Sequence, residues 1–123
     1  MSGQESRLLG RWGEALAAEH LRRAGYQILA ANWRSRFGEI DLIAADQNYL
    51  CFVEVKLRKS AAFGGAGEFV DRRKQNKLRL TAELYLSCHQ TRLQPRFDVI
   101  EVYAPQGTDT KAPRVRRIEN AFF

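Results

Sequence analysis

Two neighbouring apolar runs constrain the fold of this chain more than any other feature. Residues 39–45 and 49–57 are rich in β-branched and aromatic side chains, and the polar Asp46-Gln47-Asn48 separates them. This pattern predicts two antiparallel strands joined by a tight hairpin. In the second run apolar residues occupy both faces, which is typical of a strand in the interior of a sheet.

The remaining patterns complete an α/β fold within 123 residues, a length that suits one core and one domain, residues 1–123. Residues 5–23 are good helix formers, and Gly25 is well placed to end the helix. The further expected elements are a strand at 26–33, a mobile glycine-rich loop at 60–68, a helix at about 71–88, a strand at 96–103, a loop at 105–113 and a last strand at 114–118. The order predicts a sandwich in which helices flank a mixed central sheet.

Composition narrows the compartment and the partner. No apolar run approaches the length of a bilayer span and the N-terminus lacks a signal-peptide core, so we expect a cytoplasmic protein with no membrane partner. Cys51 and Cys88 have neither disulfide nor zinc spacing and are expected to be buried, reduced thiols. Twenty Lys and Arg against fourteen Asp and Glu give a net charge of +6. This charge favours a polyanion such as nucleic acid, although solubility alone is the alternative explanation.

The predicted hairpin brings charged side chains together. If the turn centres on Gln47-Asn48, Asp41 lies opposite Glu54 and Glu39 opposite Lys56, all on one face. Two acids facing each other on an interior strand are costly unless one holds a proton or both hold a cation. Such oxygen ligands suit Mg²⁺ or Mn²⁺. The pattern therefore predicts a metal site at Asp41 and Glu54, with a cross-strand salt bridge on a half-exposed sheet as the alternative.

Metal ligands beside a lysine suggest hydrolysis of a phosphodiester bond. A bound divalent ion lowers the pKa of a water molecule and neutralises charge on the phosphate, while Lys56 would orient that water or stabilise the transition state. Glu14 interrupts a stripe of small and apolar residues on the first helix, so it is either directed into the site or a surface residue. The predicted catalytic residues are Asp41, Glu54, Lys56 and Glu14.

Basic residues crowd the start of the second helix, where the helix dipole disfavours cations. Phosphate groups would compensate them, and an ordinary solvated charge run is the alternative. With basic residues from two other segments they form the predicted nucleic-acid-binding set: Arg34, Arg36, Arg58, Lys59, Arg72, Arg73, Lys74 and Lys77. Asp98 is expected to pair with a nearby arginine as scaffolding rather than to act in catalysis.

Several motifs resemble the YraN family of small bacterial proteins. They cover nearly the whole chain and are, in order, Gly13-Glu14, Asn32-Trp33-Arg34, residues 38–43 (GEIDLI), residues 52–58 (FVEVKLR) and Arg96-Phe97-Asp98. The family is similar to the PD-(D/E)XK nucleases, which have a restriction-endonuclease-like fold, and particularly to archaeal Holliday junction resolvases. The resemblance implies metal ligands at Asp41 and Glu54, a catalytic Lys56 and an acid at Glu14. It departs at Ile40, since no proline precedes Asp41, although that proline is often absent in the superfamily.

Three functional interpretations follow. The first is an endonuclease that uses Mg²⁺ (or Mn²⁺) to cleave DNA phosphodiester bonds, with branched or junction DNA as a more specific substrate and a homodimer as its assembly. The second is a nucleic-acid-binding module that has the nuclease fold but no activity. The third is an interaction protein in which the charged residues form a structural ion-pair cluster. The intact acids and Lys56 favour the first interpretation over the second, and the basic helix favours both over the third.

Overall fold

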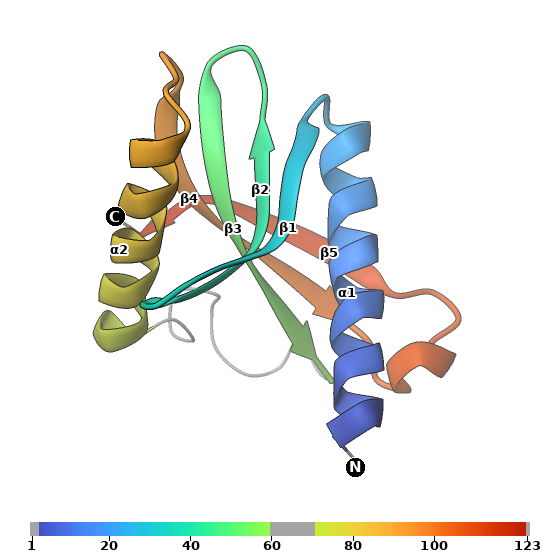
Figure 1. Ribbon diagram of the computed structural model, residues 1–123. Helices are drawn as coiled ribbons and strands as arrows, with labels where there is room; N and C mark the ends of the chain where they lie inside the picture. The colour runs from blue at the N-terminus through green and yellow to red at the C-terminus, as the bar shows by residue number, and fades with distance from the viewer. Residues whose placement is uncertain (1–2, 60–70, 123) are drawn as a thin grey trace.

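A five-stranded mixed sheet lies between two helices in the computed structural model, which describes residues 3–59 and 71–122 (Figure 1). The elements are α1 (Gly3–Arg23), β1 (Gln27–Ser35), β2 (Gly38–Ala45), β3 (Tyr49–Arg58), α2 (Arg72–Cys88), β4 (Gln94–Tyr103), the 3₁₀ turn η2 (Gly107–Asp109) and β5 (Arg114–Phe122). The strand order is β1-β2-β3-β4-β5, and only the β3–β4 pair is parallel. The predicted α/β class is confirmed, and the arrangement is consistent with a restriction-endonuclease-like fold.

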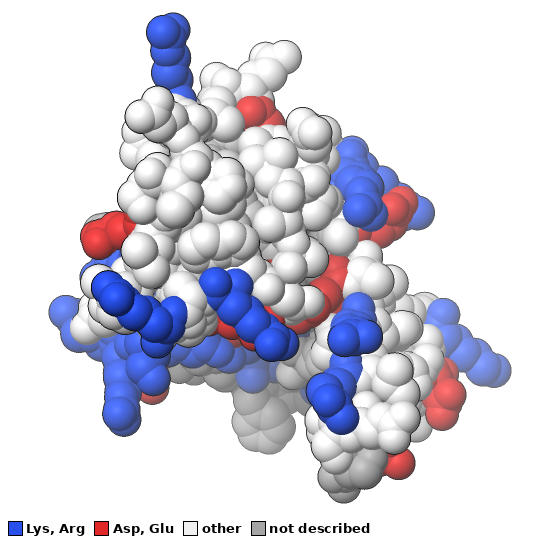
Figure 2. Space-filling view, viewed as in Figure 1, with Lys and Arg blue, Asp and Glu red and all other residues white. Residues whose placement is uncertain are grey.

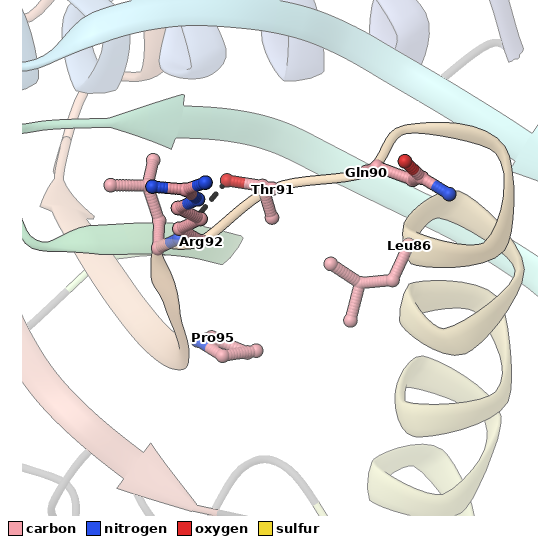
Figure 3. A pocket seen from close by; sticks show the side chains of 6 residues that line it. Leu86, Gln90, Thr91, Arg92 and Pro95 are labelled. Carbon is pink, nitrogen blue, oxygen red and sulfur yellow. Dashed lines mark hydrogen bonds between the residues drawn. The ribbon is translucent and has the colours of Figure 1, made fainter.

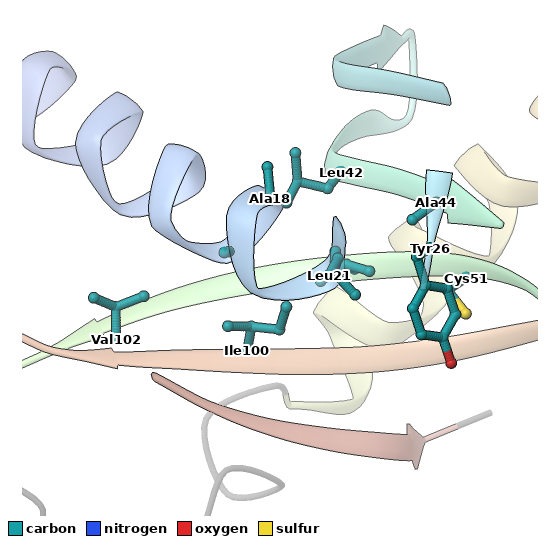
Figure 4. Close-up of a cluster of buried hydrophobic side chains, with 10 residues drawn as sticks. Ala18, Leu21, Tyr26, Leu42, Ala44, Cys51, Ile100 and Val102 are labelled. Carbon is teal, nitrogen blue, oxygen red and sulfur yellow. The ribbon is translucent and has the colours of Figure 1, made fainter. Parts of the chain in front are cut away.

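Each face of the sheet has its own hydrophobic core. Towards α2, Phe52 of β3 packs in one cluster with Leu78 and Tyr85 of the helix. Towards α1, alternate residues of the same strands pack with helix residues such as Leu21 (Figure 4). Because the two clusters share β3 but use alternate side chains, this strand is apolar on both faces, as an interior strand requires. Its predicted central position is confirmed.

Local hydrogen bonds explain where the elements end. Gly25, at φ +93°, follows the last turn of α1 in a conformation that glycine adopts at little cost. Asp46 Oδ1 accepts hydrogen bonds from the backbone N–H groups of Asn48 and Tyr49, at 2.8 and 2.7 Å, and so closes the hairpin turn. Asp71 Oδ1 accepts one from Lys74 N–H at 2.9 Å and caps the start of α2.

A buried ion pair fastens β4 to its neighbours. The Arg96 guanidinium donates two hydrogen bonds of 2.8 Å to Asp98, whose Oδ1 also accepts from Asn120 N–H at 3.0 Å. Arg96 and Arg117 both donate to the Tyr26 hydroxyl. All the hydrogen-bonding oxygens of Asp98 are therefore directed to scaffold groups, and the predicted pairing of Asp98 with arginine is confirmed.

Some sequence-based expectations differ from the structure. Cys51 is buried as expected, but Cys88 is exposed at the end of α2, so that prediction was wrong. The last strand continues four residues beyond Ile118, since Phe122 still packs into the core beside α2. The predicted loop at 60–68 lies outside the described residues. Among those that are described, no helix is long and apolar enough to cross a membrane.

Candidate active site

The predicted acids lie where β2 separates from β3. The two strands pair from Ala45–Leu50 to Leu42–Val53, the register that was predicted from the turn. The residues of β2 that precede Leu42 pair only with β1. Next to the last backbone pair, the side chain of Asp41 contacts β3 in place of the backbone of β2. Its Oδ2 accepts a hydrogen bond from Val55 N–H at 2.8 Å. The end of the ladder thus places the Asp41 carboxylate against the backbone of β3, one residue beyond Glu54.

Glu54 is a buried carboxylate with two lysine partners. It is 6% exposed and lies on the α2 side of β3. Its Oε1 is 2.5 Å from Lys74 Nζ and 3.6 Å from Lys56 Nζ. The Lys56 contact follows from the predicted spacing along the strand. The Lys74 contact was not predicted, since Lys74 was expected to bind nucleic acid alone.

The ionisation of Asp41 depends on the groups around it. Burial, together with the negative charges of Glu54 and Glu14, raises the pKa of Asp41 to about 7, against the opposing effects of the Val55 N–H and Lys74. Burial also lowers the pKa of Lys56, and the neighbouring Lys74 ammonium lowers it further. The site therefore confines charged groups in a poorly solvated space. Such groups are common where a protein performs acid–base chemistry or binds a cation.

Glu14 belongs to the same charged region. The amide of Asn32 donates to both carboxylate oxygens of Glu14, at 3.0 and 3.1 Å, and to Glu39 Oε1 at 2.8 Å. Burial raises the pKa of Glu14, the Asn32 hydrogen bond opposes this, and the charge of Glu39 adds to it. Glu14 is thus directed toward the sheet rather than extended into solvent. Asn32 holds φ +52°, an uncommon conformation for a residue other than glycine.

Glu39 departs from its expected position. It was predicted to lie opposite Lys56. However, β2 is not paired with β3 at Glu39, which instead lies opposite Arg34 of β1. The Arg34 guanidinium lies 3.2 Å from Glu39 Oε2. The alternation of a strand predicts which face a residue occupies, but not where two strands separate.

Two carboxylates are available for a metal ion. Asp41 and Glu54 offer the hard oxygen ligands that Mg²⁺ and Mn²⁺ prefer, and the close contact with Lys74 shows that Glu54 Oε1 already accepts a cation. Within residues 3–59 and 71–122 no group of three or more acidic, histidine or cysteine side chains could hold a metal ion by itself. A divalent ion here would complete its coordination with water or substrate oxygens, as Mg²⁺ commonly does in phosphate-processing sites.

The basic start of α2 borders this site. Arg72, Arg73 and Lys77 are exposed, and a hollow of about 450 Å³ is lined by Asp71, Arg73, Lys74 and Lys77. Figure 2 shows Lys and Arg side chains gathered at the lower left of the face shown, where α2 begins in Figure 1. Basic side chains that border a hollow suit a phosphate backbone.

The other predicted nucleic-acid contacts differ in accessibility. Arg34 is largely exposed although it pairs with Glu39. Arg36, at the β1–β2 turn, lies over the ring of Phe37, 4.9 Å from its centroid. Lys59 is exposed, whereas Arg58 is mostly buried, with its Nε 3.6 Å from Glu101 Oε2. Arg58 is therefore held against the sheet, whereas Arg34, Arg36 and Lys59 are exposed.

A larger hollow lies at the opposite end of α2 (Figure 3). It has a volume of about 730 Å³ and is lined by Leu86, Gln90, Thr91, Arg92, Leu93 and Pro95. This lining contains no carboxylate, histidine or cysteine. The acid–lysine cluster between β2, β3 and α2 is therefore the better candidate for chemistry.

Neither the role of Asn32 nor the inward contact of Lys74 was predicted from the sequence. Asn32 is adjacent to Trp33-Arg34 in one of the family-like motifs, and asparagine is among the residues most tolerant of positive φ. These two signals together could have drawn attention to it. No local signal marks Lys74, because its contact with Glu54 joins elements 20 residues apart.

Comparison with known proteins identifies the family. Residues 13–102 match uncharacterised protein family UPF0102. A UPF0102 protein of Acetivibrio thermocellus is 43% identical over 119 residues, covering 94% of this chain and 92% of the relative. One of Caldanaerobacter subterraneus subsp. tengcongensis is 43% identical over 123 residues, covering 99% and 100%. One of Clostridium botulinum strain 657 is 40% identical over 116 residues, covering 93% of each chain. The chain therefore belongs to family UPF0102, the YraN family that its motifs resemble.

Proposed function

We propose that this protein is an endonuclease that hydrolyses DNA phosphodiester bonds with the help of Mg²⁺ or Mn²⁺. The observation that carries the proposal is the pair of acids at the β2–β3 separation, half-buried Asp41 and buried Glu54, where burial and the charge of Glu54 raise the pKa of Asp41 to about 7. Acids held this closely favour a shared cation or a proton. The adjoining basic start of α2 supports a polyanionic substrate.

Each residue has a separate role in the proposed reaction. A bound divalent ion would supply an activated water and neutralise charge on the phosphate. Asp41 and Glu54 hold the ion, and Lys56 stabilises negative charge on the reacting phosphate. Glu14, oriented by Asn32, adds an acid close to Asp41. The exposed cations of α2 bind the backbone of the DNA.

The direct test is incubation with a panel of labelled linear, flapped and branched DNAs, with Mg²⁺, with Mn²⁺ and with chelator. We expect cleavage of at least one substrate, and only with a divalent ion. Four-way junctions belong in the panel because junction DNA is the narrower form of the proposal. Sedimentation of the protein with and without DNA tests the accompanying homodimer.

A second candidate function is that of a nucleic-acid-binding module without catalytic activity. For both candidate functions the proposed compartment is the cytoplasm. The observation that favours it is the Glu54 carboxylate, which two lysines already neutralise. DNA binding without cleavage under every metal condition, by protein free of contaminating nucleases, would select this function. Cleavage in the presence of a divalent ion would exclude it.

Replacing Lys56 with alanine should separate chemistry from metal binding. We expect a loss of cleavage on the order of 10²- to 10³-fold, the usual effect of removing one group that stabilises transition-state charge. Mn²⁺ affinity should stay within about threefold, because the lysine is not a metal ligand. Single-turnover cleavage and a Mn²⁺ titration measure the two effects. Lys111→Ala, an exposed position outside the site, is the control, and loss of Mn²⁺ binding in Lys56→Ala would instead give Lys56 a structural role.

Replacing Arg73 and Lys77 with alanine should weaken DNA binding in a salt-dependent way. Each phosphate contact releases condensed counterions, so the slope of log affinity against log salt should flatten by about two units. Fluorescence anisotropy across a salt series in chelator provides the measurement. The double variant Arg92→Ala/Lys111→Ala removes the same charge elsewhere and should keep most of the slope. Equal effects from both pairs would show that DNA does not bind at the start of α2.

A further inference from the structure

One carboxylate oxygen at the site is shared by two ammonium groups. Lys74 Nζ lies 2.5 Å from Glu54 Oε1, and Lys56 Nζ lies 3.6 Å from the same atom. The Glu54 side chain is only 7% exposed, whereas that of Lys74 is 43% exposed. Glu54 is also one of the two acids that would hold the divalent ion of the proposed function. A metal ion and the Lys74 ammonium would repel each other at this oxygen, so they compete for it.

Lys74 stands between the acids and the basic surface. Its backbone is in the first turn of α2, and its side chain reaches from there to β3. The same residue lines the hollow of about 450 Å³ beside Arg73 and Lys77. A lysine carries its charge on a flexible four-carbon stem, so a modest change of rotamers can turn the ammonium from Glu54 toward this hollow. Lys77 is exposed on the same helix but has no ion pair with Glu54 among the described contacts, which makes it a matched comparison.

We propose that Lys74 is an exchangeable counter-ion that couples metal binding to nucleic-acid binding. Without metal, its ammonium neutralises Glu54 and is withheld from DNA. When a divalent ion binds Glu54, the ammonium is released and pairs with a DNA phosphate at the start of α2. This inference rests on the proposed function and adds to it a device that favours DNA binding by the metal-loaded protein. By linkage, DNA must then also strengthen metal binding by the same factor.

A metal-free double-mutant cycle tests the first half of the exchange. DNA affinity is measured in chelator for wild type, Glu54→Gln, Lys74→Met and the double variant. The neutral amide holds an ammonium less strongly than a carboxylate does, so Glu54→Gln should raise DNA affinity by about threefold to tenfold and steepen the salt slope by about one unit. Lys74→Met alone should change little. In the double variant most of the gain should disappear.

The matched background for this cycle is Lys77→Met. Glu54→Gln should give its full gain in DNA affinity when Lys77 is replaced, because Lys77 is not held by Glu54. An equal gain in the Lys74→Met and Lys77→Met backgrounds would mean that loss of a negative charge alone improves binding. That result would overturn the exchange. Thermal melts of all variants in chelator confirm that the compared proteins are folded.

A calorimetric titration with MnCl₂ in the absence of DNA tests the second half. Because Lys74→Met removes the competing cation, Mn²⁺ affinity should rise by about threefold to tenfold, while Lys77→Met stays near wild type. With Ca²⁺, which uses the same oxygen donors, the increase in DNA affinity on adding metal should be smaller in Lys74→Met than in wild type. Unchanged or weaker Mn²⁺ binding by Lys74→Met would overturn the competition. Failure of wild type and variant alike to bind Mn²⁺ would overturn the metal-dependent function itself, and the metal-free cycle would still decide whether Glu54 withholds Lys74 from DNA.

Discussion

Glu54→Gln and Asp41→Asn are each expected to reduce metal-dependent DNA cleavage by on the order of 10³-fold or more. Either change removes a negatively charged oxygen ligand, and a metal ion supplies several kcal/mol of transition-state stabilisation that depends on such ligands. Each 1.36 kcal/mol corresponds to about a tenfold change in rate. The measurement is single-turnover cleavage of the best substrate from the DNA panel, at saturating protein and metal.

Both variants should still bind DNA. Neither acid pairs with Arg72, Arg73 or Lys77 among the described contacts, and Glu54→Gln is expected to bind metal-free DNA more tightly than wild type. Glu119→Gln is the matched control, because this half-exposed acid lies on β5, which β4 separates from β3. It should cleave at the wild-type rate. If cleavage survives in Asp41→Asn and Glu54→Gln, the acids do not hold a catalytic metal and the assigned site is wrong.

The sheet and its acidic pair could be predicted because they depend on local signals. The apolar pattern of residues 49–57 indicated an interior strand, and the short polar turn at Asp46-Gln47-Asn48 set the register of the hairpin. Together these placed Asp41 and Glu54 next to each other. Alternation along β3 also placed Lys56 on the face of Glu54, where the structure has it.

The rest of the site depends on packing between distant elements. Lys74 reaches Glu54 only because α2 packs on that face of the sheet, and no spacing rule joins residues 20 positions apart. Glu39 pairs with β1 because β2 is paired with β3 only from Leu42 to Ala45, and a period-2 pattern does not show where that pairing begins. Arg58 similarly pairs with buried Glu101 on the parallel strand β4, a partner that only the strand order supplies.

Asp41→Asn is further expected to make the metal-free protein more stable than wild type at about pH 8, and equally stable at about pH 4. The carboxyl of Asp41 has a pKa of about 7 in the folded protein, against 3.8 for an ordinary aspartate. Because the folded pKa is the higher one, the unfolded chain loses its proton first as the pH rises. The wild type therefore loses stability between about pH 4 and pH 7, and the loss is complete above the folded pKa.

Asparagine avoids this loss because it does not ionise, while its side-chain oxygen still accepts the hydrogen bond from Val55 N–H. The two pKa values correspond to a difference on the order of 2–4 kcal/mol at about pH 8. That is roughly 10 °C in Tm for a domain of this size. Thermal melts in chelator across this pH range provide the measurement. The control is Asp109→Asn, which makes the same substitution at an exposed acid in η2.

Adding Mn²⁺ should reduce the stability advantage of Asp41→Asn over wild type. A ligand that binds only the folded state stabilises the wild type by about 2.7 kcal/mol at a hundredfold excess over its dissociation constant. Asp41→Asn should gain much less, because it has lost one of the two carboxylates that hold the ion. If the variant melts far below wild type in chelator at about pH 8, Asp41 is a structural partner of Val55 and Lys74 rather than a strained acid. If it gains the full Mn²⁺ shift, the ion binds elsewhere in the protein.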